Sequence, residues 1–203
     1  MRLYALRMEQ STVSRGRPRS ASAHAAIMTA TRDLLREGGY EQLTFVDIAA
    51  RAGVGKQTVY RRWASKPAIV SDCVLEGLVE FSLVTAGATG DTAEDLIRWL
   101  EASHRAIGSP QTAPLVRALT AAAATDDDAA ARMAERFTGP LRDAIAATLR
   151  DGIAAGVIRA DADAAAVADI LIGTLIYTIE ARDAAAAGRV RSVVATIIRG
   201  VAA

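Results

Sequence analysis

The sequence predicts an all-α fold, and three observations support this. Apolar residues recur at steps of three and four along most of the 203-residue chain, which is the period of a helix with one buried face. No segment alternates polar and apolar residues for long enough to favour a strand. Two runs of four alanines, at 121–124 and 184–187, favour helix because alanine has the best intrinsic helix propensity.

The amino-terminal segment divides into an arm and a first helix. Residues 1–20 show neither the helical period nor the alternation of a strand, and they contain several arginines, so we expect a flexible basic arm. From about Ser22 the apolar residues recur at helical spacing. Gly38 and Gly39 are expected to end this helix, because glycine is the usual residue just beyond a helix C-terminus.

Three further helices are predicted in the next stretch. Thr44 lies three residues before Asp47, a variant of the capping box that begins a helix, and Gly53 is expected to end that helix. Ser65 can cap a later, longer helix that accepts Pro67 in its first turn, where an amide has no intrahelical partner. The predicted ranges are 45–51, 55–63 and 66–85.

The remaining sequence is helical almost throughout. Its helices are predicted over 92–107, 111–124, 127–151, 162–182 and 189–201, separated by short segments rich in Gly, Pro or Asp. The aspartates at 126–128 are expected to cap a helix, since they lack the spacing of a calcium loop. We therefore expect the arm over 1–20, a small helical domain over 21–67 and a larger one over 68–203.

The net charge of +1 hides an asymmetry between the two ends of the chain. Residues 1–70, the basic head, hold 12 Lys and Arg against 5 Asp and Glu, a net charge of +7. Residues 71–203, the acidic body, hold 12 against 18, a net charge of −6. This polarity predicts that the head meets a polyanion, with nucleic acid as the first candidate and a membrane surface as the second.

The composition also excludes several classes of site. A single cysteine, Cys73, excludes an internal disulfide and any multi-thiolate metal centre, and we expect it to be a small buried residue. No run approaches eighteen apolar residues, and the first residues lack the pattern of a secretory leader. We therefore expect a soluble cytoplasmic protein with no metal, no cofactor and no membrane partner.

A helix-turn-helix is predicted over 45–63. This unit needs a small residue in its first helix, a glycine at the turn and an aliphatic residue in its second helix, and Ala49, Gly53 and Val59 supply these. At 100° per residue, Val59 and Trp63 lie on one side of the second helix. The opposite arc is basic and rich in donors, and consists of Lys56, Gln57, Tyr60 and Arg61.

The outward arc has the chemistry that DNA recognition requires. Arg61 can make a paired hydrogen bond to guanine, and Gln57 can do the same with adenine. The residues that can reach phosphate oxygens are Thr44, Lys56, Tyr60 and Lys66, where Thr44 offers free backbone amides at a helix start as well as its hydroxyl. The alternative interpretation is a basic helix that is merely solvated.

Residues 22–70 resemble the DNA-binding domain of TetR/AcrR-type transcriptional regulators. The matching signatures are the Gly-Tyr pair before the second helix, Thr44, Ile48-Ala49, Gly53-Val54, Thr58-Val59-Tyr60 and Ser65-Lys66. By this resemblance the residues that contact the DNA backbone are Thr44, Thr58, Tyr60 and Lys66, and those that face the bases are Gln57 and Arg61. Trp63 is expected to serve as the core aromatic, and the role of Arg62 stays open.

Members of this family are typically homodimeric repressors whose C-terminal helical domain binds a small molecule. The resemblance therefore implies a ligand-responsive, sequence-specific regulator that is not an enzyme. Its expected partners are double-stranded DNA carrying a pseudopalindromic operator, a second copy of the chain and a small-molecule effector.

The basic arm has its own predicted contact with DNA. Arg15, Arg17 and Arg19 surround Gly16 and Pro18 in a pattern that resembles the AT-hook core, in which arginines lie in a narrow A·T minor groove. The alternative is a disordered tail that only improves solubility.

Two helices of the body are expected to form a dimer interface. Each carries a broad apolar face, and packing both against a second copy would give a four-helix bundle with two recognition helices about 34 Å apart. The expected interface residues are Ile170, Thr174, Val190, Val194, Ile197 and Ile198. The alternative is that both helices are simply core of one chain.

An effector pocket is expected between the middle helices of the body. The candidate residues combine aromatic walls with few polar groups, and they are Trp99, His104, Phe137, Tyr177 and Glu180. A different class of function is an all-α enzyme whose basic head serves a phosphorylated substrate or a membrane surface. That alternative lacks an acid partner for His104 and a complete phosphate-binding loop at 53–58.

Overall fold

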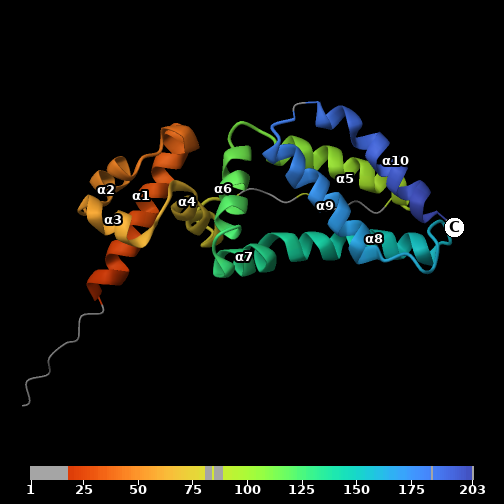
Figure 1. Cartoon of the computed structure of the whole chain (residues 1–203), viewed down its shortest axis with the longest axis horizontal. Helices are drawn as coiled ribbons and strands as arrows, with labels where there is room; N and C mark the ends of the chain where they lie inside the picture. Colours follow the sequence, from red (N-terminus) through yellow and green to blue (C-terminus); the bar gives the residue numbers. More distant parts are fainter. Residues whose placement is uncertain (1–17, 81–83, 85–88, 184, 203) are drawn as a thin grey trace, which may run out of the picture.

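The computed structural model describes residues 18–80, 84, 89–183 and 185–202, and within these ranges it contains helices and no strand (Figure 1). The helices are α1 (Pro18–Gln42), α2 (Phe45–Ala52), α3 (Lys56–Arg62), α4 (Lys66–Leu75), α5 (Thr92–Ile107), α6 (Ala113–Ala123), α7 (Asp127–Met133), α8 (Gly139–Ala154), α9 (Ala164–Glu180) and α10 (Val190–Val201). A π-helical turn, Ala134–Thr138, joins α7 to α8, and a 3₁₀ turn, Ala186–Arg189, precedes α10. The prediction of an all-α fold is confirmed.

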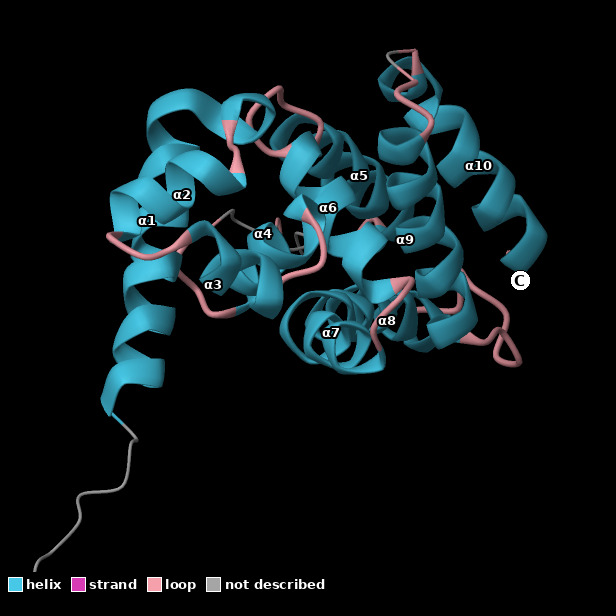
Figure 2. Cartoon of the chain, turned by 60° about the vertical axis from the view of Figure 1, so that its left-hand side comes forward, coloured by secondary structure: helices cyan, strands magenta, loops and turns pink. Residues whose placement is uncertain are grey.

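The molecule is elongated, with α1, α2 and α3 at one end (Figure 1). Helices α5, α8, α9 and α10 form the other end, and α4 and α6 lie between the two. The view turned by 60° keeps the same order (Figure 2). The part that carries the predicted DNA contacts therefore reaches the rest of the body through α4 and α6.

Each end has its own apolar core. The core of the head includes Ile27, Ile48, Val59 and Trp63, and it extends onto α4 and α6 through Cys73 and Leu115, among others. The core of the body contains Trp99, Leu100, Ile145 and Leu171, from α5, α8 and α9. A third, small cluster at the junction consists of Val74, Leu75 and Leu119, with Met133 and Phe137 packed against it.

Helix α4 is shorter than predicted. The range 66–85 is wrong in its second half, because Gly77 adopts the left-handed conformation with φ 77°. The amide of Gly77 then donates to the carbonyl of Val74 at 3.0 Å, and the amide of Leu78 to that of Cys73 at 3.0 Å, which is the Schellman arrangement that ends helices. The predicted cap at the other end is confirmed, since Oγ of Ser65 accepts from the amide of Ala68.

The single helix predicted over 127–151 is divided by the π-helical turn. Pro140 has no amide hydrogen, so the regular bond at this point is missing. The amide of Gly139 instead reaches back five residues to the carbonyl of Ala134. A Cβ on Gly139 would lie 2.8 Å from that same carbonyl oxygen, so this position needs glycine. The predicted helix cap by Asp126 is confirmed, because its carboxylate accepts from the amides of Asp128 and Ala129.

Helix α1 differs from the prediction at both ends. It begins at Pro18, before the predicted start near Ser22 and inside the range assigned to the arm. Gly39 breaks the helix with φ 72°, as expected, but a further turn continues to Gln42. None of the helices in the described ranges is both long and apolar enough to cross a lipid bilayer.

Candidate nucleic-acid interface and effector cavity

Thr44 begins α2 as the capping box predicts. Its Oγ1 accepts a hydrogen bond from the backbone amide of Asp47 at 3.2 Å, and its hydroxyl donates to Oδ2 of Asp47 at 2.5 Å. The hydroxyl proton is therefore already engaged. The phosphate contact predicted for Thr44 must use the free amides at the start of α2, or the hydroxyl must turn away from Asp47.

The turn between α2 and α3 has the geometry that the sequence predicts. Gly53 lies in the left-handed region with φ 65° and ψ 31°, which glycine reaches without strain. Its amide donates to the carbonyl of Ala50 at 3.2 Å, and the amide of Val54 donates to that of Ala49 at 3.0 Å. This turn fixes the direction in which α3 leaves α2, and hence which side of α3 faces outward.

Helix α3 presents the predicted face to solvent. Val59 is fully buried in the head, whereas Lys56, Gln57 and Arg61 are exposed. Thr58 is half-buried at the edge of this face. The structure therefore brings the predicted base-facing and phosphate-contacting groups together on one surface, and their contacts with DNA stay predictions.

Two of the predicted phosphate contacts rest on aromatic rings. The ring of Tyr60 is 57% exposed and meets the ring of Phe45 edge-on, with 4.8 Å between centroids. Nζ of Lys66 lies 4.5 Å from the ring centroid of Tyr40 and donates to the carbonyl of Glu41 at 3.1 Å. Burial, with a smaller contribution from the charge of Glu41, raises the pKa of Tyr40. These contacts orient the phenol and the ammonium group, and two of the three ammonium hydrogens remain for a phosphate.

The basic arm, which is predicted to contact DNA through three arginines, lies mostly outside the described residues. Arg15 and Arg17 precede the described residues. Arg19 is in the first turn of α1, and its side chain is outside the described part as well.

The structure adds a contact that sequence reasoning missed. Trp63, which directly follows α3, is 4% exposed, so its predicted place in the core is confirmed. Its Nε1 donates to Oδ2 of Asp72 at 2.7 Å, and Nη2 of Arg132 donates to Oδ1 of the same carboxylate at 2.8 Å. Arg132 also pairs with Asp128 at 2.9 Å. No spacing rule joins residues 63, 72 and 132, so no signal in the sequence pointed to this link.

An apolar cavity of about 50 Å³ lies in the body, between α5, α6, α9 and the π-helical turn. Its lining is almost entirely apolar, and consists of Val84, Ser103, Ile107, Val116, Leu119, Met133, Phe137, Thr138, Leu141, Ile172, Leu175 and Ile176. Of the five predicted effector residues, Phe137 lines this cavity. Trp99 is 1% exposed in the body core, and its Nε1 donates to the carbonyl of Val84 at 2.9 Å.

The other three predicted effector residues lie elsewhere. His104 lines a separate cleft, with Nδ1 2.9 Å from the carbonyl of Leu100 and Nε2 3.0 Å from Oγ1 of Thr178. Tyr177 is 67% exposed on α9, and Glu180 is exposed and accepts a hydrogen bond from Thr120. The five residues therefore do not share one cavity. No group of three His, Cys, Asp or Glu side chains in the described ranges is arranged to hold a metal.

The six predicted interface residues separate into two sets. Ile170 is 54% exposed and Thr174 is half-buried, both on one side of α9. Val190 and Val194 are at most 1% exposed and belong to the core of the same chain, so they have no surface to offer a partner. The remaining two, Ile197 and Ile198, are half-buried against that core.

Comparison with known proteins supports the interpretation of the chain as a regulator. The family model described as "Bacterial regulatory proteins, tetR family" matches residues 27–73, and the family model "Tetracyclin repressor-like, C-terminal domain" matches residues 87–197. The chain belongs to the TetR family. The two matches cover the helix-turn-helix and most of the body.

Relatives and solved structures agree with this family. The HTH-type transcriptional regulator YdeS of Bacillus subtilis (strain 168) is 31% identical over 163 residues, which cover 80% of this chain and 81% of YdeS. The crystal structure of the TetR family transcription regulator SCO0332 superposes with a TM-score of 0.57 at 29% identity, covering 90% of this chain and 100% of that one. FadR from Bacillus subtilis, solved in complex with stearoyl-CoA, shares the fold with a TM-score of 0.52 at 18% identity, over 88% and 99% of the two chains.

This TetR-family chain is therefore a DNA-binding transcriptional regulator. The helix-turn-helix of α2 and α3 lies within the part of the chain that the tetR family model matches. The relatives are named as regulators, and that agrees with the resemblance noted in the head and not with the enzyme alternative.

Proposed function

We propose that this TetR-family regulator is a homodimeric repressor, and that a small molecule with an apolar body releases it from a pseudopalindromic operator. In this proposal it acts in the cytoplasm together with its DNA, and it catalyses no reaction. The observation that carries the proposal is the junction between the cavity and α4. Three residues line the cavity and also belong to, or pack against, the small cluster that contains Val74 and Leu75 of α4, namely Leu119, Met133 and Phe137.

The size of the cavity supports a switch. The cavity of about 50 Å³ is much smaller than sites for small ligands, which usually measure about 300–1,000 Å³. A ligand must therefore push the walls apart. Since protein cores are closely packed, displacement of Met133 or Phe137 would be passed to the cluster that includes Val74 and Leu75 of α4.

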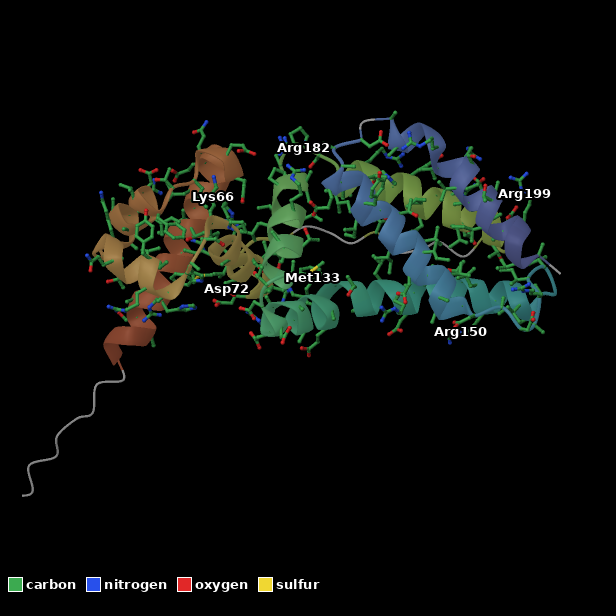
Figure 3. All side chains as sticks on the ribbon, viewed as in Figure 1. Lys66, Asp72, Met133, Arg150, Arg182 and Arg199 are labelled. Carbon is green, nitrogen blue, oxygen red and sulfur yellow. The ribbon has the colours of Figure 1, made fainter. Side chains whose placement is uncertain are left out.

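A polar link connects the same wall to the recognition helix. Arg132 directly precedes the cavity residue Met133, and the carboxylate of Asp72 joins Arg132 on α7 to Trp63 at the end of α3. The hydrogen bond that Arg132 donates to Asp72 is the main cause of the raised pKa of Arg132. Figure 3 labels Asp72 on α4 and, nearer the body, Met133 at the end of α7. A shift of α7 would thus alter the position of α3.

Thermodynamic linkage then gives the response. If the ligand binds better to a state in which the two heads leave the one-turn spacing, the operator binds that state less well, and each partner weakens the other equally. A coupling free energy of about 1–3 kcal/mol corresponds to a loss of 5- to 150-fold in operator affinity.

Dimer formation is supported by the exposed side of α9. Two large hydrophobic side chains, Ile170 and Tyr177, are 54% and 67% exposed there. Gly173 between them is exposed, and a Cβ at this position would have no neighbouring atom within 4 Å, so a second backbone can approach closely. Packing α9 against its counterpart would bury this apolar strip and place two α3 helices on one face of the DNA.

The chemical class of the ligand is inferred from the lining of the cavity and from one solved protein of similar fold. The cavity walls offer mainly aliphatic side chains and the ring of Phe137, which suit a hydrocarbon chain. FadR of Bacillus subtilis, which shares this fold, was solved with stearoyl-CoA. A fatty acyl compound is therefore the first probe to try on this chain.

The test is a titration against a preformed operator complex. A fluorescent fragment from the DNA upstream of the gene is bound by the purified protein, and palmitoyl-CoA is added while anisotropy is followed. The proposal predicts release of the DNA, and a weaker release by Met133→Phe or Leu119→Phe, which fill the cavity. Equal operator affinity with and without saturating ligand, across a panel of acyl chain lengths, would remove the switch while leaving DNA binding intact.

A further inference from the structure

A second cleft of about 340 Å³ lies where three helix ends meet, at the C-terminal ends of α5 and α9 and the N-terminal half of α6. It shares these helices with the apolar cavity but no lining residue. Its lining is His104, Arg105, Gly108, Ala113, Arg117, Thr178, Ile179, Arg182, Asp183 and Ala187. Three of its lining residues are thus arginines, in a body whose net charge is negative.

These three arginines differ from the other arginines of the body. In residues 71–203, every other described arginine has a side-chain partner, such as a carboxylate, a carbonyl of its own helix or an aromatic ring. Arg105, Arg117 and Arg182 have neither an ion pair nor a side-chain hydrogen bond to any described residue. Unpaired cations are thus gathered in one cleft of a segment with a net charge of −6.

The nearby acids are already engaged. Asp183, the one carboxylate among the lining residues, pairs with Arg189, and that hydrogen bond is the main cause of its lowered pKa. Glu180, near the C-terminal end of α9, accepts the hydroxyl of Thr120. Neither carboxylate forms an ion pair with Arg105, Arg117 or Arg182.

The backbone of Arg182 adds an independent observation. Its φ of 53° is the only left-handed value of a non-glycine residue in the described ranges. Its amide donates to the carbonyl of Ile179 and that of Asp183 donates to Thr178, so Arg182 occupies the Schellman position that glycine usually fills. A side chain held in this strained conformation suggests a use for its charge, since strain of this kind collects at functional sites.

We propose that this cleft is a binding site for a small molecule that carries a phosphate group. A terminal phosphate has three acceptor oxygens and nearly two negative charges, which suit three guanidinium groups, whereas a carboxylate has two oxygens and one charge. The apolar side of the cleft, Ala113, Ile179 and Ala187, leaves room for a short organic body. This site is separate from the apolar cavity, so it does not depend on the proposed acyl ligand.

The experiment is calorimetric titration of the full chain with pyrophosphate at constant ionic strength. The variants are Arg117→Gln and Arg182→Gly, and the control is Arg150→Gln on α8, far from the cleft (Figure 3). Nε of Arg150 bonds only to a carbonyl of its own helix. We expect saturable binding that is at least tenfold weaker in both variants and unchanged in the control.

The Arg182→Gly variant is expected to fold, so a loss of binding in it cannot be assigned to misfolding. Because glycine accepts a positive φ, this variant should melt roughly 2–4 °C higher than the wild type without ligand, although it binds pyrophosphate less well. Three results would overturn the proposal: no saturable binding, equal loss in the control, or citrate binding as tightly as pyrophosphate. A change in the dimer dissociation constant with unchanged pyrophosphate affinity would also overturn it, since the arginines would then pair with carboxylates of a second copy.

Discussion

Asp72 connects the recognition helix to the body, and replacing it in two ways separates its two contacts. In Asp72→Ala the buried Nε1–H of Trp63, now 2.7 Å from the carboxylate, loses its acceptor, which costs about 1–3 kcal/mol. The partly exposed ion pair with Arg132 adds at most about 1 kcal/mol, because solvent screens it and Arg132 keeps Asp128. We therefore expect a loss of about 1–4 kcal/mol in the free energy of unfolding.

Asp72→Asn is the matched control. Its carboxamide oxygen can still accept from Trp63, whereas the charge opposite Arg132 and the hydrogen bond that Arg132 donates are lost. The expected loss is then about 1 kcal/mol or less. Urea unfolding followed by far-UV circular dichroism measures both variants, and operator affinity is measured in parallel at concentrations where both are folded.

The two readouts separate stability from positioning. If Trp63 anchors α3 through Asp72, Asp72→Ala weakens operator binding even when fully folded, and Asp72→Asn does so much less. Equal losses of stability in the two variants would show that the charge and not the hydrogen bond matters. A loss below about 0.5 kcal/mol in Asp72→Ala would refute the anchor.

Three further predictions concern the turn, the recognition face and the buried thiol. Gly53 has a φ of 65°, so Gly53→Ala should lower the free energy of unfolding by about 1 kcal/mol. Gly55 has an ordinary φ of −66° and open space around it, so Gly55→Ala should change the free energy of unfolding by less than about 0.5 kcal/mol. Equal effects of the two variants in chemical denaturation would disprove the role of the turn. Arg61→Ala should cost about 1–3 kcal/mol at one base pair of each half-site, whereas Tyr60→Phe should weaken all sequences alike, as competition binding to operator variants would measure. Burial raises the pKa of Cys73 to about 12. As the pH rises, the thiol therefore loses its proton in the unfolded chain before it does so in the folded chain. The free energy of unfolding should then fall by about 1.4 kcal/mol per pH unit between about pH 9 and 12. Cys73→Ala should remove that slope, and an unchanged slope in this variant would assign it to other groups.

Local rules predicted the helix-turn-helix well because its signals are short-range. Thr44, Gly53 and Ser65 each act within four residues of the backbone groups they bond, so their roles could be read from the sequence. The buried Val59 and the exposed Gln57 and Arg61 follow from the helical period alone.

Two predicted helices were too long because a residue that ends or interrupts a helix was given too little weight. The predicted range 66–85 ran past Gly77, although Gly77 followed by Leu78 is the Schellman signature that ends a helix. The π-helical turn before Pro140 could have been suspected from the proline, but not its five-residue hydrogen bond.

The body sites depend on packing between distant segments, which no sequence period reports. His104 and Phe137 both lie near α9, yet they face different cavities. Val190 and Ile170 look equally apolar in the sequence, yet one is buried in the chain and the other is exposed. Three arginines that are 12 or more residues apart meet in one cleft only because three helix ends converge.

DNA recognition by a pair of α3 helices is tested most directly by hydroxyl-radical footprinting on the DNA upstream of the gene, with the full chain and no effector at low salt. Two copies that each insert α3 into the major groove predict two protected patches related by twofold symmetry, with centres about 34 Å apart on one face of the duplex. Protection should weaken steeply as salt rises. A uniform cleavage pattern at every protein concentration, or one isolated patch without a symmetric counterpart, would contradict this mode of recognition.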